Sequence, residues 1–209
     1  GNHDAVSDLA IMGKIRSRHP IIVEEGAGVH IVAGCAVACL AWPRKGELMA
    51  RLPAGTDSPT AASEAMRAVL LGFREQLGQH DGPRILLAHA MVSGSRTSTG
   101  QPLVGCDLEI GVEDLALSGA DVVALGHIHA GQSWTAGDVP IVYPGSPRRT
   151  AFGETEAKGY VVVDFIDYRR PEWTFVETPA TPMLLLEAVW DAEHGALIGT
   201  HRLTDIAGA

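Results

Sequence analysis

Asp121-Val122-Val123-Ala124-Leu125-Gly126-His127-Ile128-His129 is an apolar run that ends in a glycine and two histidines. The same design occurs earlier, in Arg84-Ile85-Leu86-Leu87-Ala88-His89, where apolar residues again lead into a histidine. Short, continuous apolar runs are typical of buried strands in parallel sheets. The segment between the two runs is long enough for a crossover that contains a helix. We therefore expect the two strands to be neighbours in a parallel sheet.

Helical and strand patterns alternate in the first part of the chain, and strand patterns dominate the rest. The clearest helix covers residues 60–79, with its apolar side chains on one face. Further helices are expected after Asp4, ending at His19-Pro20, and over 112–118. Strands are expected at 21–23, 29–32, 36–42, 139–143, 160–166, 173–177 and 183–189, and loops at 43–59 and 91–106. This order predicts an α/β fold with a largely antiparallel final section.

Composition narrows the class of protein. The chain has 209 residues, of which 46% are apolar, enough for one sizeable core. Its formal net charge of −9 argues against non-specific nucleic-acid binding by the chain alone, although bound cations or a partner subunit can supply positive charge. An odd count of three cysteines favours a reducing compartment, and no apolar run is long enough to span a membrane. We expect a cytoplasmic location and no membrane partner.

Candidate functional residues lie where ligands gather in α/β sheets, beyond the carboxyl ends of strands. His89 follows one predicted strand, and His127 and His129 follow the other. In an extended chain residues i and i+2 point to the same side, so both imidazoles can reach one centre. The amide oxygen of Asn2, combined with imidazoles, suits Mn, Fe or Zn. Beside it, His3 is a candidate general acid that Asp4 can orient.

Three segments together resemble, in their order, the later motifs of the calcineurin-like metallophosphoesterases: Gly1-Asn2-His3-Asp4, His89, and Gly126-His127-Ile128-His129. The resemblance implies a double β-sheet sandwich flanked by helices (α/β/β/α) with two divalent metal ions, Mn²⁺ being the expected one. It implies that Asn2, His89 and His127 hold one metal. His129 is then a ligand of the second metal, and His3 is the catalytic acid.

Further segments are similar to the SbcD-type exonuclease group within that family. They are Tyr143-Pro144-Gly145-Ser146-Pro147-Arg148-Arg149, Phe152-Gly153-Glu154 and Lys158-Gly159-Tyr160-Val161-Val162-Val163-Asp164. The similarity implies a DNA exonuclease or endonuclease of double-strand break repair or recombination. It implies DNA and an SbcC-type ATPase subunit as partners, with a homodimer as a further expectation. Arg148 and Arg149 are expected either to contact a phosphate backbone or to form a solvated pair.

In the family, the Asp-x-His and Gly-Asp motifs lie upstream of Gly-Asn-His; this chain begins at Gly1 without them, and no Asp-x-His occurs later. We therefore expect residues 1–180 to form a metallophosphoesterase domain truncated at its N-terminus, without most ligands of the second metal. Residues 181–209 are expected to be the start of a C-terminal capping region.

Two other functions remain open. The first is a phosphoesterase acting on small phosphoesters or phosphoproteins, which the negative charge favours slightly. The second is a catalytically silent module that binds a partner, which the missing motifs favour. Turnover of nucleotide monoesters far above that of DNA would indicate the first. Partner binding without hydrolysis would indicate the second.

Overall fold

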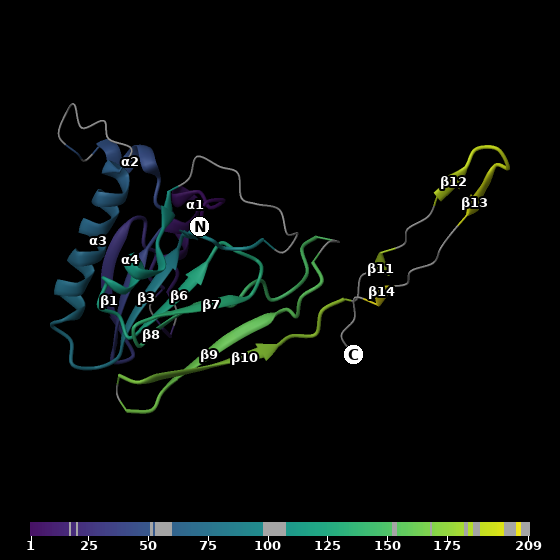
Figure 1. Ribbon diagram of the computed structural model, residues 1–209. Coiled ribbons are helices and arrows are strands. Elements are labelled where there is room, and N and C mark those ends of the chain that lie inside the picture. The colour runs from purple at the N-terminus through teal and green to yellow at the C-terminus, as the bar shows by residue number, and fades with distance from the viewer. Residues whose placement is uncertain are drawn as a thin grey trace.

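A six-stranded mixed sheet forms the centre of the molecule, with strand order β1-β2-β3-β6-β8-β7 (Figure 1). The computed structural model describes residues 1–16, 18–19, 21–50, 52, 60–97, 108–151, 154–167, 169–181, 184–185, 189–198 and 204–205. The strands of the sheet are β1 (Ala27–Val32), β2 (Cys35–Leu40), β3 (Arg84–His89), β6 (Val122–Gly126), β7 (Gln132–Ala136) and β8 (Val139–Tyr143). With helices flanking this sheet, the expected α/β class is confirmed.

The four inner strands are parallel. β3 pairs with β2 on one side and with β6 on the other, and β6 continues to β8. β1 and β7 close the two edges as antiparallel strands. In the β3–β6 register His89 is opposite Gly126, so the predicted parallel neighbours are confirmed and their carboxyl ends meet.

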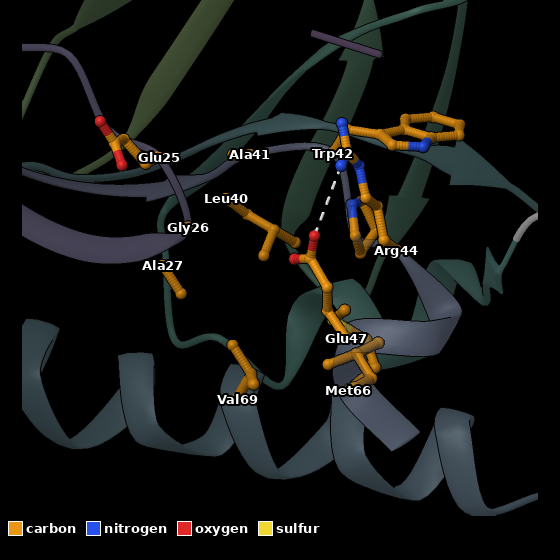
Figure 2. Close-up of a pocket in the computed structure, with 12 residues that line it drawn as sticks. Glu25, Gly26, Ala27, Leu40, Ala41, Trp42, Arg44, Glu47, Met66 and Val69 are labelled. Carbon is orange, nitrogen blue, oxygen red and sulfur yellow. Dashed lines mark ion pairs between the residues drawn. The ribbon is translucent and has the colours of Figure 1, made fainter. Parts of the chain in front are cut away.

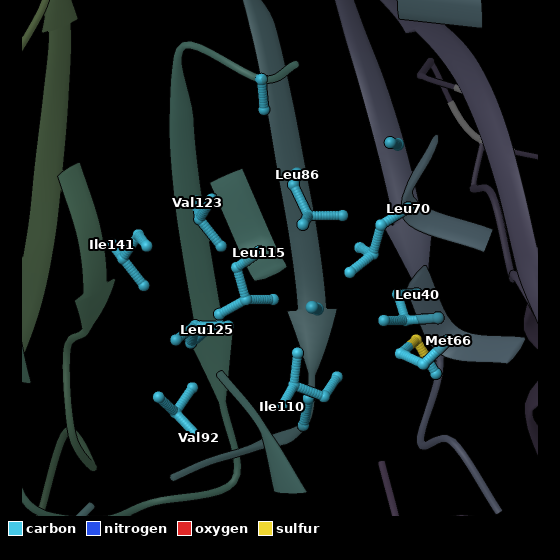
Figure 3. Packing of buried hydrophobic residues seen from close by; sticks show 14 of the residues in the cluster. Leu40, Met66, Leu70, Leu86, Val92, Ile110, Leu115, Val123, Leu125 and Ile141 are labelled. Carbon is cyan, nitrogen blue, oxygen red and sulfur yellow. The ribbon is translucent and has the colours of Figure 1, made fainter. Parts of the chain in front are cut away.

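Helices cover one face of the sheet. They are α2 (Lys45–Ala50), α3 (Ala61–Leu77) and α4 (Val112–Ala116), whereas α1 (Val6–Met12) near the N-terminus exposes Leu9, Ile11 and Met12. The long helix expected at 60–79 is confirmed as α3, and its apolar face, including Leu70, is buried. Figure 3 shows the resulting core, in which Leu86, Val123 and Ile141 of the sheet lie close to Leu115 and Leu70 of the helices. Burial of such side chains stabilises the fold by about 1.5–3 kcal/mol each.

The other face of the sheet is only partly covered. Leu86 of β3 is 0% exposed and points into the core, whereas the next residue, Leu87, is 51% exposed. β6 differs, because Val122 and Val123 are both buried. The expectation of a doubly buried strand is therefore confirmed for β6 and wrong for β3. A cavity of about 500 Å³ lies on this open face, lined among others by Val37, Cys39 and Leu87.

The final section is antiparallel, as expected. β9 (Gly159–Phe165) and β10 (Pro171–Glu177) form a hairpin in which Trp173 is opposite Val163. Residues of this hairpin and of β8 line a common cavity of about 320 Å³. Beyond it, β11 (Leu184–Leu185) pairs with β14 (Thr204–Asp205), and β12 (Val189–Asp191) pairs with β13 (Ala196–Ile198). These two short ladders lie apart from the sheet in Figure 1.

Several expectations for secondary structure were wrong, among them the helix after Asp4, which ends at Met12 and not at His19-Pro20. Residues 21–23 form no strand; Ile22 instead lines the cavity on the open face of the sheet. Within 43–59, expected as a loop, α2 forms because its Leu48 is buried against the core. β7 was not expected, and neither was the short pair of β4 (Met91–Val92) and β5 (Glu109–Ile110). Among the described residues, no helix combines the length and the apolar character needed to cross a membrane.

Candidate metal centre

The residues predicted to hold metal come together at one cavity of about 400 Å³, at the carboxyl ends of β3 and β6. Asn2 comes from the N-terminal turn, His89 from the end of β3, and His127 and His129 from the segment after β6. The full lining is Asn2, His3, His89, Thr97, His127, Ile128, His129, Thr150, Ala151 and Glu154. Three of the chain segments singled out from the sequence therefore meet at this cavity, whereas residues 143–146 do not line it.

A second, smaller cavity of about 50 Å³ lies next to Trp42. Figure 2 shows its lining, with an ion pair between Arg44 and Glu47 (Nη1–Oε1, 3.5 Å). None of the predicted site residues lines it. Its volume has room for about one or two water molecules, so the candidate site is the cavity of about 400 Å³ that the predicted residues line.

Asn2 and His89 are in direct contact. Asn2 Oδ1 lies 3.0 Å from His89 Nε2. Burial lowers the pKa of His89 to about 4, so its imidazole is neutral at neutral pH, which is the form that binds metals. On the other side of the ring, a Cβ added at Gly126 would lie 3.1 Å from His89 Nδ1. The absence of a side chain at Gly126 therefore lets the His89 ring approach the backbone closely.

His127 has an unusual backbone conformation, with φ of 111°. The chain is therefore not extended here, and the reason expected for the two histidines facing one side was wrong. Instead, Ile128 between them is buried at 4% exposure, and both neighbours face the cavity. The His127 ring lies 4.5 Å from the Trp42 ring and 5.4 Å from the His89 ring, measured between centroids. Trp42 was not identified as a site residue from the sequence.

His129 is held at both its ring and its backbone. Nδ1 lies 3.1 Å from Thr150 Oγ1 and 3.6 Å from Glu154 Oε1. Its carbonyl oxygen accepts hydrogen bonds from Ser146 N and Lys158 Nζ, both at 3.2 Å. Gly145 is needed for this approach: its φ is +80°, and an added Cβ would lie 2.8 Å from the same carbonyl oxygen.

Glu154 and Lys158 form a buried ion pair, with Glu154 Oε2 2.9 Å from Lys158 Nζ. Their exposed fractions are 2% and 1%. Burial raises the pKa of Glu154, but hydrogen bonds from Lys158 and Thr150 outweigh it and lower that pKa to about 2. Both residues belong to segments similar to the SbcD-type group, but the sequence alone indicates no role for either. Phe152 and Gly153, quoted in the same motif, are outside the described residues.

The other predicted residues have different surroundings. His3 lines the cavity, and its Nε2 is 3.4 Å from Asn2 Nδ2. The Asp4 carboxylate contacts the amino group of Gly1. Arg149 donates from Nε to the Glu154 carbonyl and from Nη1 to the Thr181 carbonyl, both at 3.0 Å. Arg148 is exposed, and the cavity lining contains neither arginine nor Asp4.

Within the described ranges, no three His, Cys, Asp or Glu side chains converge as a group able to hold a metal ion. The cavity is nevertheless lined by the amide of Asn2 and by the imidazoles of His89, His127 and His129. The 3.0 Å between Asn2 Oδ1 and His89 Nε2 is close to the spacing of adjacent ligand atoms around a cation with bonds of about 2.1 Å. Amide oxygen and neutral imidazole are a set that suits borderline divalent cations.

Neither a family model nor a curated protein matches the chain.

Proposed function

We propose that this chain carries Asn and His ligands of a two-metal phosphodiesterase of the calcineurin-like metallophosphoesterase type, with an α/β/β/α sandwich, and that its substrate is DNA. The observation that carries the proposal is the single cavity lined by Asn2, His89, His127 and His129. These residues come from segments up to 127 positions apart, and all have oxygen or nitrogen donors. Chance placement of four such donors at one cavity is a poor explanation.

Each residue has a part in the reaction. Asn2, His89 and His127 would hold one divalent cation, and His129 would hold the second. Mn²⁺ is the expected ion at both positions. The cations supply charge stabilisation at the phosphoryl oxygens and lower the pKa of attacking water. His3, at the cavity wall, protonates the leaving oxygen. Trp42 packs against the His127 ring, with 4.5 Å between the ring centroids.

DNA is favoured over other phosphoesters by the segments similar to the SbcD-type group. Those segments include Ser146 and Lys158, which both donate hydrogen bonds to the His129 carbonyl oxygen. Arg148 is exposed close to this loop and is available for a phosphate oxygen. Because the net charge is −9, most phosphate contacts are assigned to a partner, for which an SbcC-type ATPase is proposed, and to the bound cations. A homodimer and a cytoplasmic location belong to the same proposal.

The test measures Mn²⁺ bound per chain and cleavage of linear double-stranded DNA by the same preparation. His127→Ala and His89→Ala are expected to weaken Mn²⁺ binding and to abolish cleavage. His194→Ala is the matched control, because His194 is an exposed histidine outside the cavity. Retention of full Mn²⁺ affinity in His127→Ala and His89→Ala would exclude the assigned ligands.

The net charge of −9 supports a second candidate function, a phosphoesterase acting on small phosphoesters. It uses the same donors, so the Mn²⁺ measurements do not separate it from the nuclease. Parallel assays of a nucleotide monoester and of linear DNA distinguish the two enzymes. Faster turnover of the monoester would favour the small-substrate enzyme, and Mn²⁺ binding without either activity would favour a silent partner-binding module.

A further inference from the structure

Thr150, Glu154 and Lys158 form a connected network behind His129. Thr150 Oγ1 donates to Glu154 Oε1 at 2.7 Å, and Thr150 N donates to Glu154 Oε2 at 3.0 Å. Lys158 Nζ contacts Glu154 Oε2 at 2.9 Å, Glu156 Oε1 at 2.8 Å and the His129 carbonyl at 3.2 Å. Three contacts account for the three protons of an ammonium group, so Lys158 is charged and Glu154 opposite it is a carboxylate.

The direction of each hydrogen bond then follows from proton counting. A carboxylate only accepts hydrogen bonds, and a threonine hydroxyl has a single proton to give. Since Thr150 gives that proton to Glu154, its oxygen can only accept from His129 Nδ1, 3.1 Å away. His129 Nδ1 must therefore carry a proton. In the neutral ring, the other nitrogen, Nε2, then has a free lone pair.

We propose that Thr150 and Glu154 are positioning residues that hold neutral His129 in the tautomer protonated at Nδ1, leaving Nε2 as the donor to a divalent cation. The identity of the ligand as a cation rests on the proposed function, whereas the tautomer does not. Free histidine prefers the opposite tautomer, protonated at Nε2, which presents no lone pair there. The network thus sets which nitrogen of His129 can bind metal, much as a carboxylate orients a metal-binding histidine elsewhere.

The experiment reads the tautomer by NMR in the full chain with its histidines labelled with ¹⁵N and with metal removed by chelator. The pH is set about two units above the usual histidine pKa of about 6.5, so that the rings are neutral. Two-bond couplings between ring protons and nitrogens identify the protonated nitrogen, and His129→Gln assigns the signal. His129 is expected to be protonated at Nδ1 in the wild type.

Two substitutions at Thr150 test the cause. Thr150→Val keeps the shape but removes the hydroxyl, and it is expected to shift His129 to the Nε2-protonated form. Thr150→Ser restores the hydroxyl and is expected to restore the Nδ1-protonated form. Thr150 is exposed, so neither change is expected to impair folding. Protonation at Nε2 in the wild type, or an unchanged signal in Thr150→Val, would overturn the proposal.

The affinity for Mn²⁺ separates this inference from the proposed function. If both hold, Thr150→Val weakens Mn²⁺ binding by about 10- to 100-fold, and Thr150→Ser recovers most of the loss. If the tautomer is as stated but wild-type protein binds no Mn²⁺, the proposed function fails and the assignment of the tautomer stands. If the wild type binds Mn²⁺ but His129 is protonated at Nε2, the proposed function stands and the assignment of the tautomer fails.

Discussion

At the scale of single residues, the candidate site depends on buried neighbours that the sequence did not single out. His89, His127 and His129 were predicted because each follows an apolar run and matches a family motif in order. Glu154 was quoted within such a motif, but its burial against Lys158 could not be read from sequence, since two charges so close in the chain are usually solvated. Trp42 was missed because its contact with His127 arises only in the folded sheet.

Glu154→Gln is expected to reduce stability in a pH-dependent way. The folded-state pKa of about 2 lies below the ordinary value of 4.5, so the carboxylate stabilises the fold above pH 4.5, and this contribution is lost as the pH falls towards 2. The free energy of unfolding of the wild type should exceed that of Glu154→Gln by about 3 kcal/mol at neutral pH, and by little near pH 2. Urea unfolding at both pH values measures the difference. Glu172→Gln, at an exposed position of β10, is the control; a pH-independent gap between wild type and Glu154→Gln would contradict the assignment.

Gly145→Ala should destabilise the loop that holds His129. The added Cβ would meet the His129 carbonyl oxygen at 2.8 Å, in addition to the cost of a positive φ. Gly137→Ala is the matched control, because Gly137 also has a positive φ, of +59°, but nothing within 4 Å of an added Cβ. We expect Gly145→Ala to lower the free energy of unfolding by about 1–3 kcal/mol more than Gly137→Ala. Equal losses in thermal unfolding would show that the contact with His129 is unimportant.

At the scale of elements, the most periodic or most apolar segments were predicted best. α3, β3 and β6 were expected within a residue or two, because a helical apolar face and unbroken apolar runs are strong signals. β7 was missed because Gln132–Ala136 alternates weakly, although Gly137-Asp138 between β7 and β8 is a typical hairpin turn. α2 was missed because six residues give too little periodicity to recognise a helix.

The two faces of β3 are expected to respond very differently to truncation. Leu86→Ala removes a fully buried side chain and should cost about 2–5 kcal/mol of unfolding free energy. Leu87→Ala, at the neighbouring half-exposed position, should cost less than about 1 kcal/mol. Chemical denaturation of the two variants measures both. Similar losses would mean that the open face of the sheet is covered in solution.

At the scale of the whole molecule, the cavity exists only because the sheet brings distant segments together. A ligand that binds the folded chain alone stabilises it, by about 2.7 kcal/mol at a concentration 100 times the Kd. Mn²⁺ is therefore expected to raise the melting temperature of the wild type and of His194→Ala, but not of His127→Ala. Calorimetry with and without Mn²⁺ measures the shift. An equal rise in all three proteins would place the stabilising cation elsewhere.

The pairing of β3 with β6 also determines when the cavity can form during synthesis. Asn2 leaves the ribosome before its partner His89, which comes 87 positions later, and His127 follows only with the end of β6. At about 5–20 residues per second, the N-terminal turn waits several seconds before its neighbours have emerged. Parallel strands joined by a long crossover also pair slowly. A cation assigned to Asn2, His89 and His127 would accordingly be acquired by the completed sheet, and could not guide the nascent chain towards it.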